Sequence, residues 1–267
     1  MNNRKAVRVH QILSFSNFFN TVRKATNNKK TKYIFFPGCA LSSYSPDAVG
    51  KIIDYLEIKL NNEVGSILKC CGKPTLMIGE KEKFIERIES VKKEFDRVQA
   101  EIIIVSCQSC YDILSKNIRN QKILSLWELL PEIGIPEEKV GIGKDSDVVF
   151  NIHDSCTDRK DFSVQDGIRW VVNELGYKVE EDKEKKSQNR CCGFGRGVKK
   201  EKKGHILSYC AACAESMEYA GADSLHIVDL LFGEKYTKDK AEKRVPNLKN
   251  KWVNRYKTKL EMNKRKR

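Results

Sequence analysis

The sequence has no long apolar segment. No hydrophobic run approaches the roughly 18 residues that a membrane-spanning helix needs. The first residues lead into no apolar stretch of signal-peptide length with a cleavage site behind it. Hydrophobic residues make up 40% of the 267 positions and charged residues 32%. We therefore expect a cytoplasmic protein that is at most peripheral to a membrane.

Acidic residues are in deficit. The chain holds 36 Asp and Glu against 50 Lys and Arg, which gives a formal net charge of +14, and the excess is concentrated at the two ends. Such a distribution attracts an acidic partner protein, an anionic membrane surface or nucleic acid. A solvated, lysine-rich tail over 234–267 is the simpler interpretation. Trp252 and Tyr256 among the lysines are too unspecific to favour nucleic acid as a partner.

No cysteine lies outside two matching sets of five. Each set is a lone Cys, a Cys-Cys-Gly and a Cys-x-x-Cys: Cys39, Cys70, Cys71, Cys107 and Cys110, then Cys156, Cys191, Cys192, Cys210 and Cys213. Adjacent cysteines cannot form a disulfide with each other without strain, but they can present two thiolates to one metal centre. Disulfide frameworks belong mainly to small secreted chains. Reduced thiolates that bind metal are the better interpretation.

Strand patterns place the first five cysteines together. Apolar runs at 33–36, 64–68 and 102–105 each end within three residues of a cysteine, and helical patterns separate the runs. Alternating strands and helices predict a parallel sheet, in which sites lie beyond the carboxyl ends of the strands. We therefore expect one shared centre at this edge.

The second half repeats the order of the first. A strand at 148–152 leads to His153 and Cys156, a strand at 205–209 leads to Cys210, and an apolar run follows at 225–228. The predicted fold is α/β, with two tandem related βαβ-type modules, parallel sheets and helical extensions at both ends. Four segments are predicted: an amphipathic basic helix and linker at 1–31, the first module at 32–144, the shortened second module at 145–233 and the basic tail at 234–267.

An amphipathic helix is predicted within the first segment, at 7–24. Its apolar positions recur at helical spacing, with basic residues at both ends. Such a helix could dock on a partner or lie on a membrane surface, although packing on its own domain is the more common role. The polar run at 180–188 is predicted to be a solvated loop.

The cysteine pattern resembles the CCG cysteine-rich domain found in the B-type subunits of heterodisulfide reductases, a family whose relatives include iron–sulfur subunits of glycolate and lactate oxidation systems. In the first copy 30 residues separate Cys39 from Cys70 and 35 separate Cys71 from Cys107, as in the family. The second copy departs from it, because only 17 residues separate Cys192 from Cys210. We expect the shorter interval to leave the second centre less covered, with lysines 199, 200, 202 and 203 at its opening.

The resemblance implies one or two iron–sulfur clusters, each held by one five-cysteine set, and the family's noncubane type is among the cluster forms that it implies. Thiolates also suit zinc, which takes four ligands, and zinc stays open as an alternative at the second set. His153 precedes Cys156 as a histidine does in the family, which makes it a candidate proton donor to a substrate sulfur. A structural hydrogen bond is an equally good interpretation of this histidine.

Two functions follow from this interpretation. The first is an iron–sulfur oxidoreductase component that carries electrons to or from a thiol, disulfide or quinone-linked partner. The sequence has no ferredoxin-type cysteine run, no flavin fingerprint and no haem motif, so an electron-transfer partner subunit with conventional clusters or flavin is implied. The alternative is a non-catalytic metal-binding regulator or scaffold.

Overall fold

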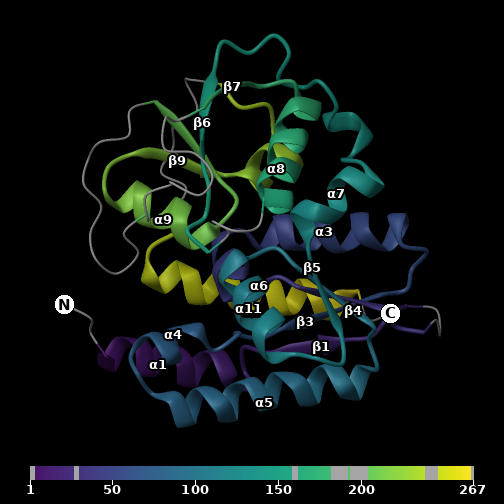
Figure 1. Ribbon diagram of the computed structural model, residues 1–267, viewed down its shortest axis with the longest axis vertical. Coiled ribbons are helices and arrows are strands. Elements are labelled where there is room, and N and C mark those ends of the chain that lie inside the picture. Colours follow the sequence, from purple (N-terminus) through teal and green to yellow (C-terminus); the bar gives the residue numbers. More distant parts are fainter. Residues whose placement is uncertain are drawn as a thin grey trace. The chain divides into compact units, whose positions relative to one another are not determined.

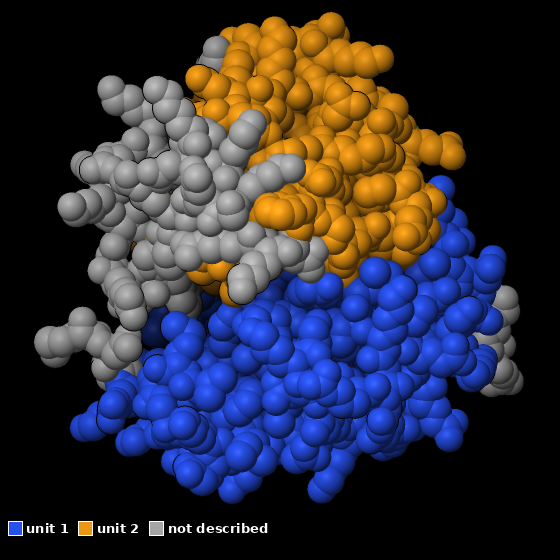
Figure 2. Space-filling view, viewed as in Figure 1, with its two compact units in different colours: residues 1–124, 247–267 blue, residues 125–246 orange. Residues whose placement is uncertain are grey.

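The computed structural model describes residues 4–26, 30–157, 162–181, 192, 204–237 and 246–265. The chain divides into two compact units (Figure 2), of which the first comprises residues 1–124 and 247–267 and the second residues 125–246. Each unit is built on one sheet (Figure 1). The four segments defined by the cysteine motifs are a division by sequence pattern and stay a prediction. No described helix is both long and apolar enough to cross a membrane.

The sheet of the first unit has the strand order β1-β3-β2-β4-β5. Its central strand β2 runs parallel to β3 on one side and to β4 on the other. At one edge, β1 pairs with β3 in the antiparallel direction. The strands are β1 (Thr21–Arg23), β2 (Tyr33–Phe36), β3 (Val64–Leu68), β4 (Ile102–Val105) and β5 (Lys122–Ser125).

Helices cover both faces of this sheet. In Figure 1, α5 (Lys81–Val98) lies along one face, and α3 (Pro46–Lys59) and α11 (Leu248–Lys264) lie along the other. Helix α3 begins at Pro46, because the Ser45 hydroxyl accepts a hydrogen bond from the Ala48 amide and proline suits the first turn. On the α5 side Phe36 packs edge-on against Phe95, with 5.8 Å between the ring centres. Three shorter helices connect the strands: α2 (Gly38–Tyr44), α4 (Lys73–Met77) and α6 (Gln108–Asn117).

The second unit repeats the topology of the first. Its four strands have the order β7-β6-β8-β9, and every neighbouring pair is parallel. The strands are β6 (Val149–His153), β7 (Lys178–Glu180), β8 (His205–Ser208) and β9 (Asp223–His226). The helices are α7 (Leu126–Ile133), α8 (Phe162–Leu175), α9 (Ala211–Tyr219) and α10 (Ile227–Phe232), with a 3-10 turn η1 (Glu137–Lys139). The predicted fold class, two related α/β modules with helical extensions, is confirmed.

The prediction of a single helix at 7–24 is wrong. Helix α1 (Arg4–Phe15) ends early, and residues 21–23 form β1, which protects the edge of β3. The helix also buries the side that looked polar: Gln11 and Ser14 are fully buried, whereas Val9 and Ile12 are 56% and 64% exposed. The apolar periodicity of this segment therefore did not identify its buried face.

The solvated-tail interpretation is wrong for residues 248–264. Helix α11 packs against α2, α3 and β1 within the first unit, and Arg255, Thr258 and Met262 are buried. Its side chains hold the end of α2, because Asn254 donates to the Ser43 carbonyl at 3.0 Å and Thr258 to the Ser42 carbonyl at 2.9 Å. A helix with this much charge is hard to identify as packed, since only Met262 of its three buried residues is apolar.

The predicted solvated loop at 180–188 lies mostly outside the described residues. Its first residue, Glu180, ends the edge strand β7 beside β6 and is exposed. In α5 the buried positions are Phe84, Ile88, Val91, Phe95 and Val98, whereas Ile85 is exposed. In so highly charged a helix the tertiary contacts decide which apolar residues are buried.

Gly167 permits the close contact between α7 and α8 in the second unit. A Cβ atom at this position would overlap the carbonyl oxygen of Trp127, a residue that is itself fully buried. We expect Gly167→Ala to destabilise the second unit by about 1–3 kcal/mol through overpacking. Urea unfolding would measure this effect. The control is Asn173→Ala, an exposed position on the same helix, and equal stability of the two variants would contradict the packing argument.

Candidate metal centres

The five cysteines of the first set meet at the carboxyl edge of the first sheet. Cys39 lies in the first turn of α2 just after β2, Cys70 and Cys71 follow β3, Cys107 precedes α6 and Cys110 lies in the first turn of α6. The Sγ atoms of Cys39 and Cys70 are 3.7 Å apart. Cys110 in turn interacts with both Cys71 and Cys107. Cys39 is partly exposed, and the other four are buried.

Two glycines allow the backbone to approach this group of sulfur atoms. Gly38 has a φ of 71°, and a Cβ atom there would lie 2.9 Å from the Sγ of Cys110. Gly72 has a φ of 83°, and its amide donates a long hydrogen bond of 3.5 Å to the Sγ of Cys70. Both conformations favour glycine. These residues leave space beside the sulfur atoms and direct an N–H group toward one of them.

The sulfur atoms cannot all be thiolates on their own. The hydrogen bond between Cys39 and Cys70, with a second one between Cys71 and Cys70, lowers the pKa of Cys70 well below its usual value. The same hydrogen bond, together with burial, raises the pKa of Cys39 well above its usual value, and contacts with Cys107 and Cys71 raise that of Cys110. A buried set of this kind needs added positive charge to ionise fully. Soft metal ions supply that charge and bind thiolate sulfur preferentially.

Sequence reasoning missed the polar residues that pack against this set. The Nε2 atom of Gln11 in α1 donates to the Sγ of Cys70 at 3.4 Å. The Thr75 hydroxyl in α4 donates to the Oε1 of Gln11 at 2.9 Å, and Arg87 in α5 donates to Thr75. A sequence signal existed only in the polar residues at positions 10, 11 and 14, which lie between the apolar residues of the same segment.

The second unit places four described cysteines in a similar way. Cys156 follows β6 and is partly exposed, Cys210 precedes α9, and Cys213 lies in its first turn. The Cys213 amide donates to the Cys210 carbonyl at 2.8 Å, much as that of Cys110 donates to Cys107 at 2.9 Å. Cys192 is buried beside them. Cys191 and the lysine-rich segment at 193–203 lie outside the described residues, so the expected exposure of the second centre stays a prediction.

A histidine joins the sulfur atoms of the second set. His153 is the last residue of β6 and is buried. Its ring nitrogen and the Sγ atoms of Cys192 and Cys213 all lie within 4.8 Å of one another. Contacts with Cys192 and Cys210, together with burial, raise the pKa of Cys213 well above its usual value. Nitrogen and sulfur atoms thus converge here, which is a donor set that zinc also accepts.

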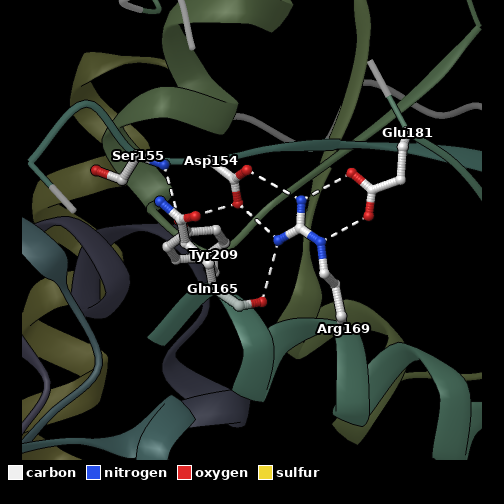
Figure 3. A network of polar contacts seen from close by, with 6 residues as sticks. All are labelled: Asp154, Ser155, Gln165, Arg169, Glu181 and Tyr209. Atoms are coloured by element: carbon white, nitrogen blue, oxygen red, sulfur yellow. Dashed lines mark hydrogen bonds and ion pairs between the residues drawn. The ribbon is translucent and has the colours of Figure 1, made fainter. Parts of the chain in front are cut away.

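A network of polar contacts supports the loops that carry Cys156 and Cys210. Figure 3 shows the Arg169 guanidinium of α8 between two carboxylates. It donates to both oxygens of Asp154 at 3.0 Å and to those of Glu181 at 2.6 and 2.8 Å. Tyr209, which precedes Cys210, donates to Asp154 at 3.4 Å and accepts from the Ser155 amide at 2.9 Å. The residues just before two cysteines are therefore joined to each other.

The charge of Arg169 is stable in this network. Burial opposes that charge, but the hydrogen bonds to Glu181 and Asp154 outweigh it and raise the pKa of Arg169 further. Asp154 is almost fully buried, so it depends on Arg169 for compensation of its negative charge. The role of the network is to position the second set of cysteines.

Comparison with known proteins agrees with the two modules. A family model described as a cysteine-rich domain, CCG, matches residues 33–115 and 150–228, together more than half of the chain. The D-type subunit of the dihydromethanophenazine:CoB–CoM heterodisulfide reductase of Methanosarcina mazei is 25% identical over 191 residues. That match covers 64% of this chain and 44% of the relative, so the chain spans less than half of that protein. Helices α1 and α11 lie outside the family match.

Removing the positive charge of the network tests its role. We expect Arg169→Met to destabilise the second unit by about 3–5 kcal/mol, because it leaves the buried Asp154 carboxylate without its partner. Urea unfolding followed by circular dichroism would measure the change. Arg97→Met, which removes an exposed ion pair with Glu94, is the control and should cost less than about 1 kcal/mol. Similar losses in the two variants would contradict a supporting role for Arg169.

Proposed function

Because the chain belongs to the cysteine-rich CCG domain family, we propose that it is an iron–sulfur component of an oxidoreductase complex. It would carry electrons to or from a thiol, disulfide or quinone-linked partner. The single observation that carries the proposal is the meeting of five cysteine sulfur atoms beyond the carboxyl ends of three adjacent parallel strands. The name of the relative in Methanosarcina mazei, part of a heterodisulfide reductase, supports the same class of reaction.

The first set would hold an iron–sulfur group through Cys39, Cys70, Cys71, Cys107 and Cys110. Five sulfur donors exceed the four that zinc takes in structural sites, whereas iron–sulfur groups are held by several thiolates. When bound, such a group supplies one-electron chemistry. The protein's part is to bury four of the five sulfur atoms and to leave the Cys39 side partly open. Electron exchange with a partner would therefore take place at Cys39.

The second set would hold metal through Cys156, Cys191, Cys192, Cys210 and Cys213. We propose that His153 binds this metal directly, because its ring nitrogen lies close to two of the sulfur atoms. The mixed nitrogen and sulfur donors keep zinc open as the alternative here. If zinc occupies this site, the second unit has a non-catalytic, supporting role. Donation of a proton by His153 to a substrate sulfur, as the sequence suggests, is the alternative role.

A partner subunit follows from the chemistry. Electrons must reach the centre from a carrier, and we propose a partner with conventional clusters or flavin. The basic surface of the chain, with a net charge of +14, would attract an acidic partner of this kind or an anionic membrane surface. That attraction weakens as salt concentration rises. A cytoplasmic protein with peripheral attachment to a membrane fits this proposal.

Replacing one cysteine pair tests the two-centre model. We expect Cys70→Ser/Cys71→Ser to remove the iron of the first centre and to leave the metal of the second, because hydroxyl groups are poor ligands for soft metals. Iron, zinc and sulfide analysis of protein purified without oxygen would measure this. Cys191→Ser/Cys192→Ser is the matched variant and should show the reverse loss. Complete loss of metal in either variant with an intact fold would rule out two separate centres.

His153→Ala distinguishes a metal ligand from a proton donor. We expect the variant to lose metal from the second centre while the first centre keeps its iron. The control is Ser224→Ala, a buried polar position on β9 of the same unit. Full retention of metal in His153→Ala, with loss of electron transfer alone, would restore the proton-donor role and contradict direct binding.

A further inference from the structure

The two terminal helices of the first unit lie outside the family match and yet reach its metal centre. Helix α1 supplies Gln11 beside Cys70, and α11 packs on α2, whose first turn carries Cys39. The two helices also contact each other, because the rings of His10 and Trp252 lie 5.4 Å apart. Residues that flank the cysteine-rich modules in sequence therefore surround the first centre in space.

Arg255 is a buried cation with unused hydrogen-bond donors. Its side chain is fully buried, and its Nη2 donates to the Ser14 carbonyl at 3.1 Å and to the Oδ1 of Asn20 at 3.2 Å. Its Nε and Nη1 have no hydrogen-bond partner among the described residues, where it also forms no ion pair with a carboxylate. A buried guanidinium without an anion is costly, so Arg255 indicates that negative charge belongs nearby.

The sulfur atoms of the first centre are the candidates for that negative charge, because α11 packs on α2, which carries Cys39. The Arg255 guanidinium lies over the Trp252 ring, with 6.0 Å from its central carbon to the ring centre, and that ring packs on His10. His10 in turn contacts Gln11, since its Nδ1 lies 3.0 Å from the Nε2 of Gln11. Arg255 is therefore connected through packed side chains to the residue that contacts Cys70. Thiolates and the sulfides of an iron–sulfur group would provide the missing anion.

Gln11 is oriented so that its amide nitrogen lies between the Sγ of Cys70 and the Nδ1 of His10. Arg87 donates to the Thr75 oxygen, so the Thr75 proton is free to reach the Oε1 of Gln11. The carbonyl side of Gln11 is thereby fixed on Thr75, and its Nε2 lies 3.4 Å from the Sγ of Cys70. Thr75 and Arg87 are positioning residues, because they act through Gln11. The resulting hydrogen bond strengthens when Cys70 carries negative charge.

We propose that α1 and α11 form a polar cap, defined by Gln11 and Arg255, that raises the reduction potential of the first centre. The inference rests on the proposed iron–sulfur function. Reduction adds one electron from the donor to the centre, while Arg255 keeps its proton and Gln11 keeps its hydrogen bond. Positive charge and N–H donors stabilise the more negative, reduced form over the oxidised form, which raises the potential.

The test is a redox titration of the full-length protein, purified without oxygen and followed by electron paramagnetic resonance. Arg255→Met should make the first centre about tenfold harder to reduce, which is about 59 mV for a one-electron couple. Gln11→Leu should also lower the reduction potential of the first centre, by a smaller amount. Lys257→Met removes the same charge from an exposed position on α11 and should leave the potential unchanged. Arg255→Lys keeps the charge and should retain most of the potential.

The outcomes separate the inference from the proposed function. Unchanged potentials in Arg255→Met and Gln11→Leu, with normal iron content, would overturn the polar cap and leave the iron–sulfur assignment standing. Absence of iron from the unmodified protein would overturn both. If Arg255→Met does not fold, Gln11→Leu decides, because it removes one donor to Cys70 and keeps Arg255. If Gln11 had only a structural role, the reduction potential of the first centre in Gln11→Leu would equal that of the unmodified protein.

Discussion

Mutual repulsion of buried thiolates is the constraint on which this structure depends. Five sulfur atoms meet at one edge of the first sheet. Cys70 contacts Cys39 and Cys71, and Cys110 contacts Cys71 and Cys107, and these contacts lower the pKa of Cys70 while raising those of Cys39 and Cys110. Buried groups of like charge cannot all ionise unless a cation joins them. The parallel pairing of β2, β3 and β4 brings these groups together. The fold therefore places the cysteines where they can all ionise only if a metal compensates their charge.

The second unit has the same topology as the first, but different residues pack against its cysteines. Its strand order repeats that of β3, β2, β4 and β5, and its cysteines again follow the carboxyl ends of strands. Around the first centre the supporting residues come from α1, α5 and α11. In the second unit they come from the network of Arg169, Asp154 and Tyr209, and His153 adds a nitrogen atom. Related modules can therefore differ in the metal they hold and in its properties.

The parallel strands and the cysteine positions were predictable from the sequence, because short apolar runs ending at cysteines leave few alternatives. The contributions of the termini were not. Helix α1 packs Phe15 on the apolar core, but it buries Gln11 and Ser14 instead of Val9 and Ile12. The reason is that Gln11 contacts the Sγ of Cys70 and Ser14 contacts Arg255. Arg255 in a lysine-rich segment likewise resembles any solvated charge. Periodicity detects burial against apolar surfaces and fails where a helix packs on a polar site.

The central claim is that the first set of cysteines holds an iron–sulfur group. The most direct measurement is quantification of iron, acid-labile sulfide and zinc in the unmodified protein purified without oxygen, together with its visible absorbance before and after reduction. We expect a brown protein with several irons per chain, matching sulfide, and absorbance that is bleached by reductant. A folded, colourless protein with stoichiometric zinc at both sites and no sulfide would contradict this claim.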